Sequence, residues 1–403
     1  MGLDASSLQG LFGDALDTRA EAFARFEQAA MPAPSTESWR YLDLDFDLID
    51  YAPAASAGSQ EAHDDLLTGL PSPEAVVIDG FASAYGSTAR IIPFSEVPVP
   101  TDSDRFGAGA AAFTRDGIII DVPRGKAISE PLVIDVRVQS SGTSSYPYVG
   151  IELDDGAEAA VVVAYRSASH IDSVMVPRID INVGQGSHLR LLGIQNLGHE
   201  TRSVSYNRVT VGRDASVKVG EIGLGGGLAR LDLGVGLDGS GAEVQVTGLY
   251  FGHRQQILDY RLVITHRGAN TRSNVFLKGA VEDQAQSIFA GLLKIEKDAR
   301  HSSAFETNRN LVLSEDAKAN SVPNLEILCN DVMCGHASSV GPLEEEHLYY
   351  LQSRGLRQRP AERLLVGGFF REIVQRLPVD GVAGPVTEVV DQRFALAQAE
   401  GRV

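Results

Sequence analysis

A turn motif that recurs along the middle of the chain constrains the fold more than any other feature of the sequence. Each copy has an apolar residue, three turn-prone residues, a small residue and a polar residue, followed by a strand-like run. The best-defined copies occupy residues 153–159, 183–189 and 211–217. Looser copies begin at Leu237 and Ile264, and further ones begin at Val281, Ile295 and Leu313. The early copies lie about 26 to 30 positions apart, and the later ones about 14 to 18.

This repeat predicts a β-solenoid in which each copy of the motif forms a corner between strands. Glycine and aspartate permit tight turns, some at positive φ, and the small residue lets neighbouring coils stack closely. Each coil then buries its inward side chains against the coils above and below it. Full periods followed by half periods indicate that each coil has turns at more than one corner. The alternative to a solenoid is a β-sandwich or a propeller. The residues predicted to line the core include Val217, Val219, Val244, Val246, Ile288 and Phe289.

The sequence on either side of the repeat has a different character. Apolar residues at helical spacing between Asp4 and Ala30 predict a helix, and short strands are expected at 75–78 and 91–92. Three helices are predicted after the repeat, at 343–351, 360–377 and 383–400. The chain therefore divides into a mixed N-terminal region (1–105), a β-solenoid core (106–341) and a C-terminal helical region (342–403).

The composition excludes several classes of protein. The chain of 403 residues has 53 acidic and 35 basic residues and a net charge of −18, so it would repel the phosphates of a nucleic acid. With two cysteines, Cys329 and Cys334, it is not a disulfide-stapled scaffold. Neither a signal peptide nor a membrane-spanning apolar stretch is evident. We therefore expect a cytoplasmic protein that binds neither nucleic acid nor membrane.

Sequence motifs of common enzymes are missing. No Gly-x-x-x-x-Gly-Lys-Ser/Thr loop occurs, so the chain is not expected to hydrolyse ATP itself. The glycine-rich run 223–227 does not match a dinucleotide-binding loop and is predicted to be a solenoid corner or loop. The densest group of candidate metal ligands is the segment 329–336. A thiolate at Cys334 and an imidazole at His336 could bind iron or zinc, but they do not complete a tetrahedral site. The alternative to a metal site is that the two thiols are buried for packing and the histidine lies in a loop.

The segment after residue 309 resembles the SufB/SufD family. Its matching motifs keep the family's order and spacing over about 70 residues. They are NLVLSEDA (310–317), PNLEI (323–327), DV (331–332), CGHA (334–337), VG (340–341), EE (345–346), YYLQSRG (349–355) and the helix around Phe369. The run ESWRY (37–41) and the Cys-x-His block resemble the SufD branch of the family. The SufB branch would carry a Glu-His-Glu-like sequence at that block and a cluster-building cysteine near 310–313, which is absent.

The resemblance implies a right-handed parallel β-helix between two helical regions. It also implies membership of the SufBCD complex, in which SufC ATPase subunits act on a SufB–SufD heterodimer to assemble iron–sulfur clusters. The chain would then be a non-catalytic scaffold, not an enzyme, with a SufB-like paralogue and a SufC-like ATPase as partners. The resemblance implies no permanently bound cofactor. It does imply a transient iron–sulfur cluster at the interface with the partner. The sequence does not decide whether a flavin binds.

Individual residues acquire expected roles from the same resemblance. His336 corresponds to the histidine that faces an essential cysteine of SufB, which makes it a candidate ligand for transient iron. Cys334 corresponds to the neighbouring family cysteine, and Cys329 is assigned to packing. The C-terminal helices correspond to the segment that docks SufC, and packing on the solenoid is the alternative for their apolar positions. The docking positions are Leu348, Tyr349, Leu351, Leu364, Leu365, Phe369 and Ile373.

Two other functions stay open at this point. β-Helices also occur as carbohydrate-active enzymes, although no cluster of carboxylates with arginine or lysine is evident from spacing here. The chain could equally be a SufB-like scaffold or a homodimer that works without a paralogue.

Overall fold

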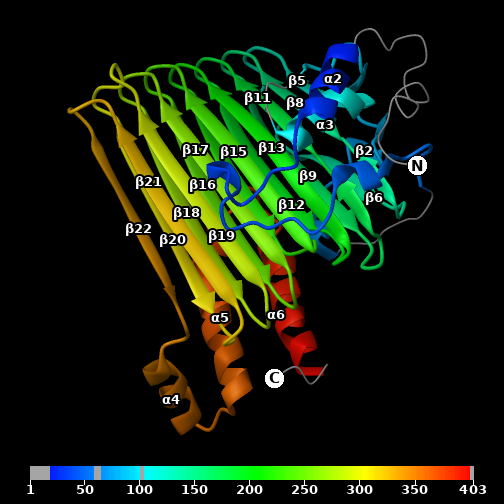
Figure 1. Cartoon of the computed structure of the whole chain (residues 1–403). Helices are drawn as coiled ribbons and strands as arrows, with labels where there is room; N and C mark the ends of the chain where they lie inside the picture. Colours follow the sequence, from blue (N-terminus) through cyan, green and yellow to red (C-terminus); the bar gives the residue numbers. More distant parts are fainter. Residues whose placement is uncertain (1–18, 59–64, 100–103, 400–403) are drawn as a thin grey trace.

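Two long β-sheets face each other over most of the chain, with helices at either end of the sequence (Figure 1). The computed structural model describes residues 19–58, 65–99 and 104–399. Sheet A, as we call the first sheet, has twelve strands within these residues, and sheet B has ten.

Most strands of the two sheets are eight to eleven residues long. Sheet A consists of β1 (Ala52–Pro53), β4 (Ala89–Pro93), β5 (Asp116–Val122), β7 (Thr143–Ser145), β8 (Tyr148–Leu153), β10 (Ser173–Met175), β11 (Arg178–Val183), β13 (Thr201–Val211), β15 (Leu228–Leu237), β17 (Ile257–His266), β19 (Gln286–Ile295) and β21 (Lys318–Ile327). Sheet B consists of β2 (Ala75–Ile78), β3 (Phe81–Ala84), β6 (Leu132–Val138), β9 (Glu158–Ser167), β12 (His188–Asn196), β14 (Ser216–Gly223), β16 (Glu243–Gly252), β18 (Arg272–Val281), β20 (Ser303–Val312) and β22 (Met333–Gly341).

The strands are wound as a parallel β-solenoid. From β11 onward, successive long strands alternate between the sheets, and each pairs in parallel with the strand two positions later in the same sheet. One coil therefore consists of one strand from each sheet and the two corners that join them. This arrangement confirms the solenoid prediction and excludes the sandwich and the propeller.

The recurring turn motif forms the corners, as predicted. Its fourth residue has positive φ in each of the three best-defined copies: Gly156 (70°), Gly186 (66°) and Asp214 (53°). Only glycine, and less readily aspartate or asparagine, adopts this conformation without strain, which explains the composition of the motif. The motifs at 153–159, 183–189 and 211–217 lie at one edge of the solenoid, whereas the loop after Gly223 lies at the other.

The main core lies between the two sheets. Val217, Val219, Val244 and Val246 all belong to it, as predicted. The prediction for Ile288 was wrong. Phe289 points into the core, but Ile288 points to the outside of sheet A and packs with the N-terminal segments, because successive side chains of a strand face opposite ways.

N-terminal segments cover the outer face of sheet A. They contain helices α2 (Ala20–Gln28) and α3 (Arg105–Phe113) and the 3₁₀ turns η2 (Glu37–Trp39) and η3 (Leu48–Asp50). A third 3₁₀ turn, η4 (Asp65–Leu67), lies on the other side, where Leu66 joins the apolar cluster between sheet B and the C-terminal helices. The Trp39 ring stacks on Phe106 with 5.4 Å between ring centres, and the Arg230 guanidinium lies 4.1 Å from its centre. The predicted helix between Asp4 and Ala30 is observed at 20–28, and the part before residue 19 lies outside the described residues.

The first coils are closed by strands from this same region. β4 pairs antiparallel with β5, and β2 forms an antiparallel pair with β3 while running parallel to β6. The expected strands at 75–78 and 91–92 are therefore parts of the solenoid sheets.

The C-terminal helices are α4 (Glu345–Ser353), α5 (Gln358–Val374) and α6 (Ala383–Ala399). Gly355, with φ of 90°, follows α4. Helices α5 and α6 pack on the outer face of sheet B, where Phe370, Ile373 and Val386 join Leu249 and Phe251 in one apolar cluster. Across the described ranges, no helix has the length and apolar character needed to cross a bilayer.

Candidate functional site

The last coil leaves the solenoid open at one end. Among the described strands, β21 pairs only with β19, and β22 pairs only with β20 (Figure 1). The free edges of both strands present backbone N–H and C=O groups that could pair with another chain. Large apolar side chains are exposed around the same end: Phe305, Ile327, Leu328, Met333 and Val340. We call this set the open-end surface.

His336 and Cys334 lie on β22, at this open end. They occupy alternate positions of the strand, and the registered partner of Cys334, Ala304, is a core residue, so both face the inside of the coil. His336 is exposed, whereas Cys334 is half-buried against the main core. Cys329 is buried in that core, as its assignment to packing predicted.

The inside of the solenoid changes from aliphatic to polar as it reaches His336. One column of inward side chains on sheet B runs through Val219, Val246 and Val275. The same column then continues with Glu306 and ends with His336. The position that is valine in the earlier coils is therefore occupied by Glu306 and then by His336 in the last two coils.

A hydrogen-bond network fills the neighbouring inward positions. The Tyr250 hydroxyl donates to Oδ1 of Asn310 (2.6 Å), and Asn310 Nδ2 donates to Oδ1 of Asn308 (2.6 Å). Ser321 Oγ donates to the same Asn308 oxygen (2.8 Å), and Ser338 Oγ donates to Ser321 Oγ (2.8 Å). The network links both sheets and reaches β22, so it fixes the position of the last coil.

Glu306 is the residue of this site that the sequence reading missed. Its side chain is 2% exposed, and neither carboxylate oxygen has a hydrogen-bond partner. Burial raises its pKa to about 7. The available signal was the alternation in β20, which places Glu306 at an inward position that is Val275 one coil earlier.

The ligand types at this end suit a metal of intermediate softness, but the described residues do not by themselves complete a site. Thiolate, imidazole and carboxylate are ligands for iron and zinc. Within the described residues, no group of three or more His, Cys, Asp or Glu side chains is placed to hold a metal ion. Any metal bound here would need ligands beyond the side chains that the structure describes at this end.

The predicted docking residues of the C-terminal helices have unequal exposure. Tyr349 and Leu364 are exposed by 74% and 52%, and Ile373 is fully buried. Ile373 packs against sheet B, so its side chain cannot contact a partner while α5 stays in place. The remaining four positions are half-buried: Leu348, Leu351, Leu365 and Phe369.

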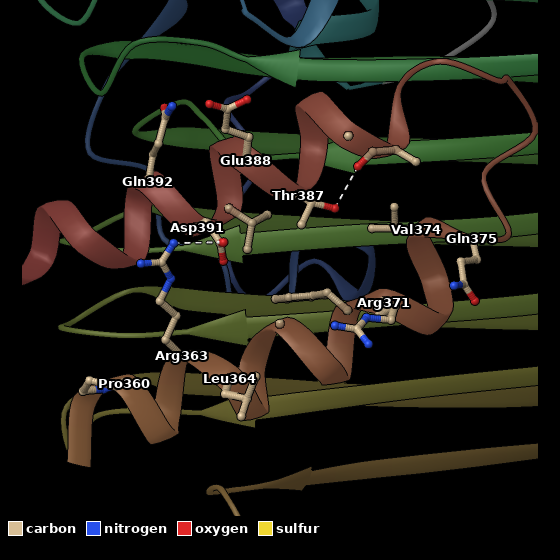
Figure 2. A pocket seen from close by; sticks show the side chains of 15 residues that line it. Pro360, Arg363, Leu364, Arg371, Val374, Gln375, Thr387, Glu388, Asp391 and Gln392 are labelled. Atoms are coloured by element: carbon tan, nitrogen blue, oxygen red, sulfur yellow. Dashed lines mark hydrogen bonds and ion pairs between the residues drawn. The ribbon is translucent and has the colours of Figure 1, made fainter. Parts of the chain in front are cut away.

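A groove of about 980 Å³ separates α5 from α6 (Figure 2). Leu364 lines it from α5 and Thr387 from α6, with Phe370 below. An ion pair between Arg363 and Asp391 (2.9 Å) bridges the two helices. The lining of the groove thus combines apolar side chains, such as Leu364 and Phe370, with the ion pair that crosses it.

A buried lysine ties α5 to sheet B. Lys278 of β18 is 4% exposed, and its Nζ donates to the Phe369 carbonyl (2.8 Å) and to Oε2 of Glu372 (2.8 Å). The hydrogen bond from Lys278 lowers the pKa of Glu372. β18 pairs with β20, and β20 pairs with β22, so the helix is connected through two strands to the strand that carries His336.

Comparison with known proteins agrees with the earlier resemblance. Residues 136–369 match the family model described as SUF system FeS cluster assembly, SufBD core domain. An iron–sulfur cluster assembly SufBD family protein of Mycobacterium bovis is 31% identical over 309 residues, which cover 75% of this chain and 76% of that protein. The iron–sulfur cluster assembly protein SufD of Escherichia coli is 25% identical over 91% of this chain and 90% of its own length. SufD of Bacillus subtilis is 28% identical over 74% of this chain and 69% of its own length. The chain therefore belongs to the SufBD family of iron–sulfur cluster assembly proteins.

Proposed function

We propose that this chain is a cytoplasmic, non-catalytic scaffold subunit of an iron–sulfur cluster assembly complex. It pairs with a SufB-like paralogue through its open end and docks a SufC-like ATPase on its C-terminal helices. The cluster is cargo that forms at the interface and is passed on, not a resident cofactor. The observation that carries the proposal is the exposed His336 on β22, an edge strand with one free side at the end of the solenoid.

The open end suits a paralogue because both sheets end there together. A second solenoid placed end to end would cover the apolar residues of the open-end surface and satisfy the free edges of β21 and β22. A neutral imidazole binds iron readily, so His336 can share a metal with a thiolate of the partner.

The helices suit an ATPase because they offer an exposed apolar groove and are tied to the solenoid. An inserted helix would contact Leu364 in the groove between α5 and α6. Movement of α5 would pull on Lys278 and reach β22 through β18 and β20. ATP turnover in the partner would in this way change the surroundings of His336.

The test is co-expression of the chain with its SufB-like and SufC-like partners. His336→Ala should leave co-purification of the three proteins intact but lower the iron and sulfide content of the complex. His170→Ala is the matched control, because His170 is also exposed but follows β9, several coils away. A normal iron and sulfide content in the His336→Ala complex would remove His336 from the mechanism.

A homodimer is the second candidate, since the open end could also receive a second copy of the chain. Sedimentation of the chain alone and with its paralogue discriminates between the two. The homodimer is supported if the chain self-associates and the paralogue does not displace the second copy.

A further inference from the structure

Glu306 occupies a position for which the fold itself prefers an aliphatic residue. Its registered neighbours in the three preceding coils, Val219, Val246 and Val275, are all valine. An inward carboxylate without a hydrogen-bond partner costs stability, because it gives up water without gaining a substitute. A buried polar group without a partner calls for an explanation, and a bound ion is one.

The opposite sheet makes room for this carboxylate. Gly291 of β19 faces Glu306, and a Cβ at Gly291 would collide with both carboxylate oxygens. Every other residue type would therefore displace the Glu306 side chain. Gly291 provides the space and Glu306 provides the carboxylate. These are two separate features of the sequence, and both occur one coil below His336.

We propose that Glu306 and His336 together bind one divalent transition-metal ion at the open end, with a ligand from the partner completing the site. The two residues are registered neighbours on adjacent parallel strands and face the same side. Adjacent strands lie about 4.8 Å apart, which lets a carboxylate oxygen and an imidazole nitrogen reach one ion at about 2.0–2.2 Å each. The inference rests on the proposed function, in which the ion is the iron of the nascent cluster.

The test is metal binding by the full-length chain, alone and in complex with its paralogue, with Co²⁺ as the probe. Co²⁺ is titrated in competition with a chromophoric chelator, and its visible absorption reports ligation. Glu306→Val should lower the Co²⁺ affinity by at least about 10- to 100-fold, because losing a direct ligand should cost no less than losing a residue that supports one. Glu306→Asp, which keeps the carboxylate, should have a smaller effect.

Two features make the variants informative. Glu306→Val introduces the residue that the preceding coils carry, so the fold should be retained, and an unchanged circular dichroism spectrum with an equal or higher melting temperature checks this. Glu221→Gln is the matched control, because Glu221 is another inward glutamate of sheet B with an unpaired oxygen, three strands away from β20. It should leave Co²⁺ binding unchanged.

The outcomes separate this inference from the proposed function. If Glu306→Val binds Co²⁺ as tightly as the natural chain while His336→Ala does not, Glu306 is not a ligand, and the role of His336 stands. If neither variant changes Co²⁺ affinity, or if the natural chain binds no Co²⁺ in either state, the inference is overturned. The iron and sulfide content of the His336→Ala complex then decides the proposed function independently.

Discussion

The replacement of Glu221 by glutamine tests how a buried ionisable group inside the solenoid makes the free energy of unfolding depend on pH. Glu221 points inward from β14 and lines a small cavity of about 30 Å³ together with Tyr165, Gln195 and Tyr260. Its Oε1 atom has no hydrogen-bond partner. Burial raises the pKa of Glu221 from its ordinary value of 4.5 to about 8. The folded protein therefore holds this residue as a neutral acid at pH 7, whereas the unfolded chain ionises it.

The sign of the effect follows from proton binding. Between pH 4.5 and 8 the folded state binds one more proton at Glu221 than the unfolded state does, so stability falls as the pH rises through this range. The slope is about 1.4 kcal/mol per pH unit, which gives a loss of about 4 kcal/mol between pH 5 and pH 9. Glutamine has nearly the same shape and does not ionise. Glu221→Gln should remove this loss.

The assay is urea unfolding of both proteins at pH 5, 7 and 9, followed by the fluorescence of Trp39 and by circular dichroism. The free energy of unfolding of Glu221→Gln should exceed that of the natural chain by an amount that grows by about 3–4 kcal/mol from pH 5 to pH 9. Glu243→Gln is the control, since Glu243 is exposed on the adjacent strand β16, and its curve should stay parallel to that of the natural chain. Parallel curves for Glu221→Gln itself would refute the reasoning.

Four further predictions concern packing and partner docking. Ile373→Ala should lower the free energy of unfolding by about 2–5 kcal/mol, because a fully buried side chain is removed from the interface of α5 with sheet B. Leu364→Asp should change stability little and instead weaken co-purification of the ATPase, and the opposite pattern would contradict the proposed docking groove. Trp39→Ala should cost about 3–5 kcal/mol, since it removes the ring between Phe106 and Arg230, and a melting temperature equal to that of the natural chain would argue against this. Gly184→Ala should lower the free energy of unfolding by about 1–3 kcal/mol, because a Cβ would lie 2.8 Å from backbone atoms of Leu153 and Asp155 in the neighbouring coil. Gly367→Ala is the control, because a Cβ at this position of α5 would meet no other atom. It should leave the melting temperature unchanged or raise it.

The candidate site was only partly visible in the sequence. The residue types of Cys334 and His336 stood out, because thiol and imidazole side chains are scarce in this chain and lie two positions apart. Glu306 did not stand out among 53 acidic residues. Its significance depends on the strand register, which aligns it with Val275 on one side and His336 on the other, and on Gly291 across the coil.

The solenoid, its corners and the helices that follow it could all be predicted from the sequence. These features depend on local properties: positive φ at residues such as Gly156 and Asp214, alternation within strands, and breaks such as Gly355. What covers each sheet, and which end of the solenoid stays open, became known only from the folded chain. Ile288 and Ile373 are equally apolar in the sequence, yet they are buried by different partners, the N-terminal segments and sheet B respectively. Whether a side chain is in a core, under a helix or at a free edge depends on contacts between segments far apart in the chain, and no local pattern encodes those contacts.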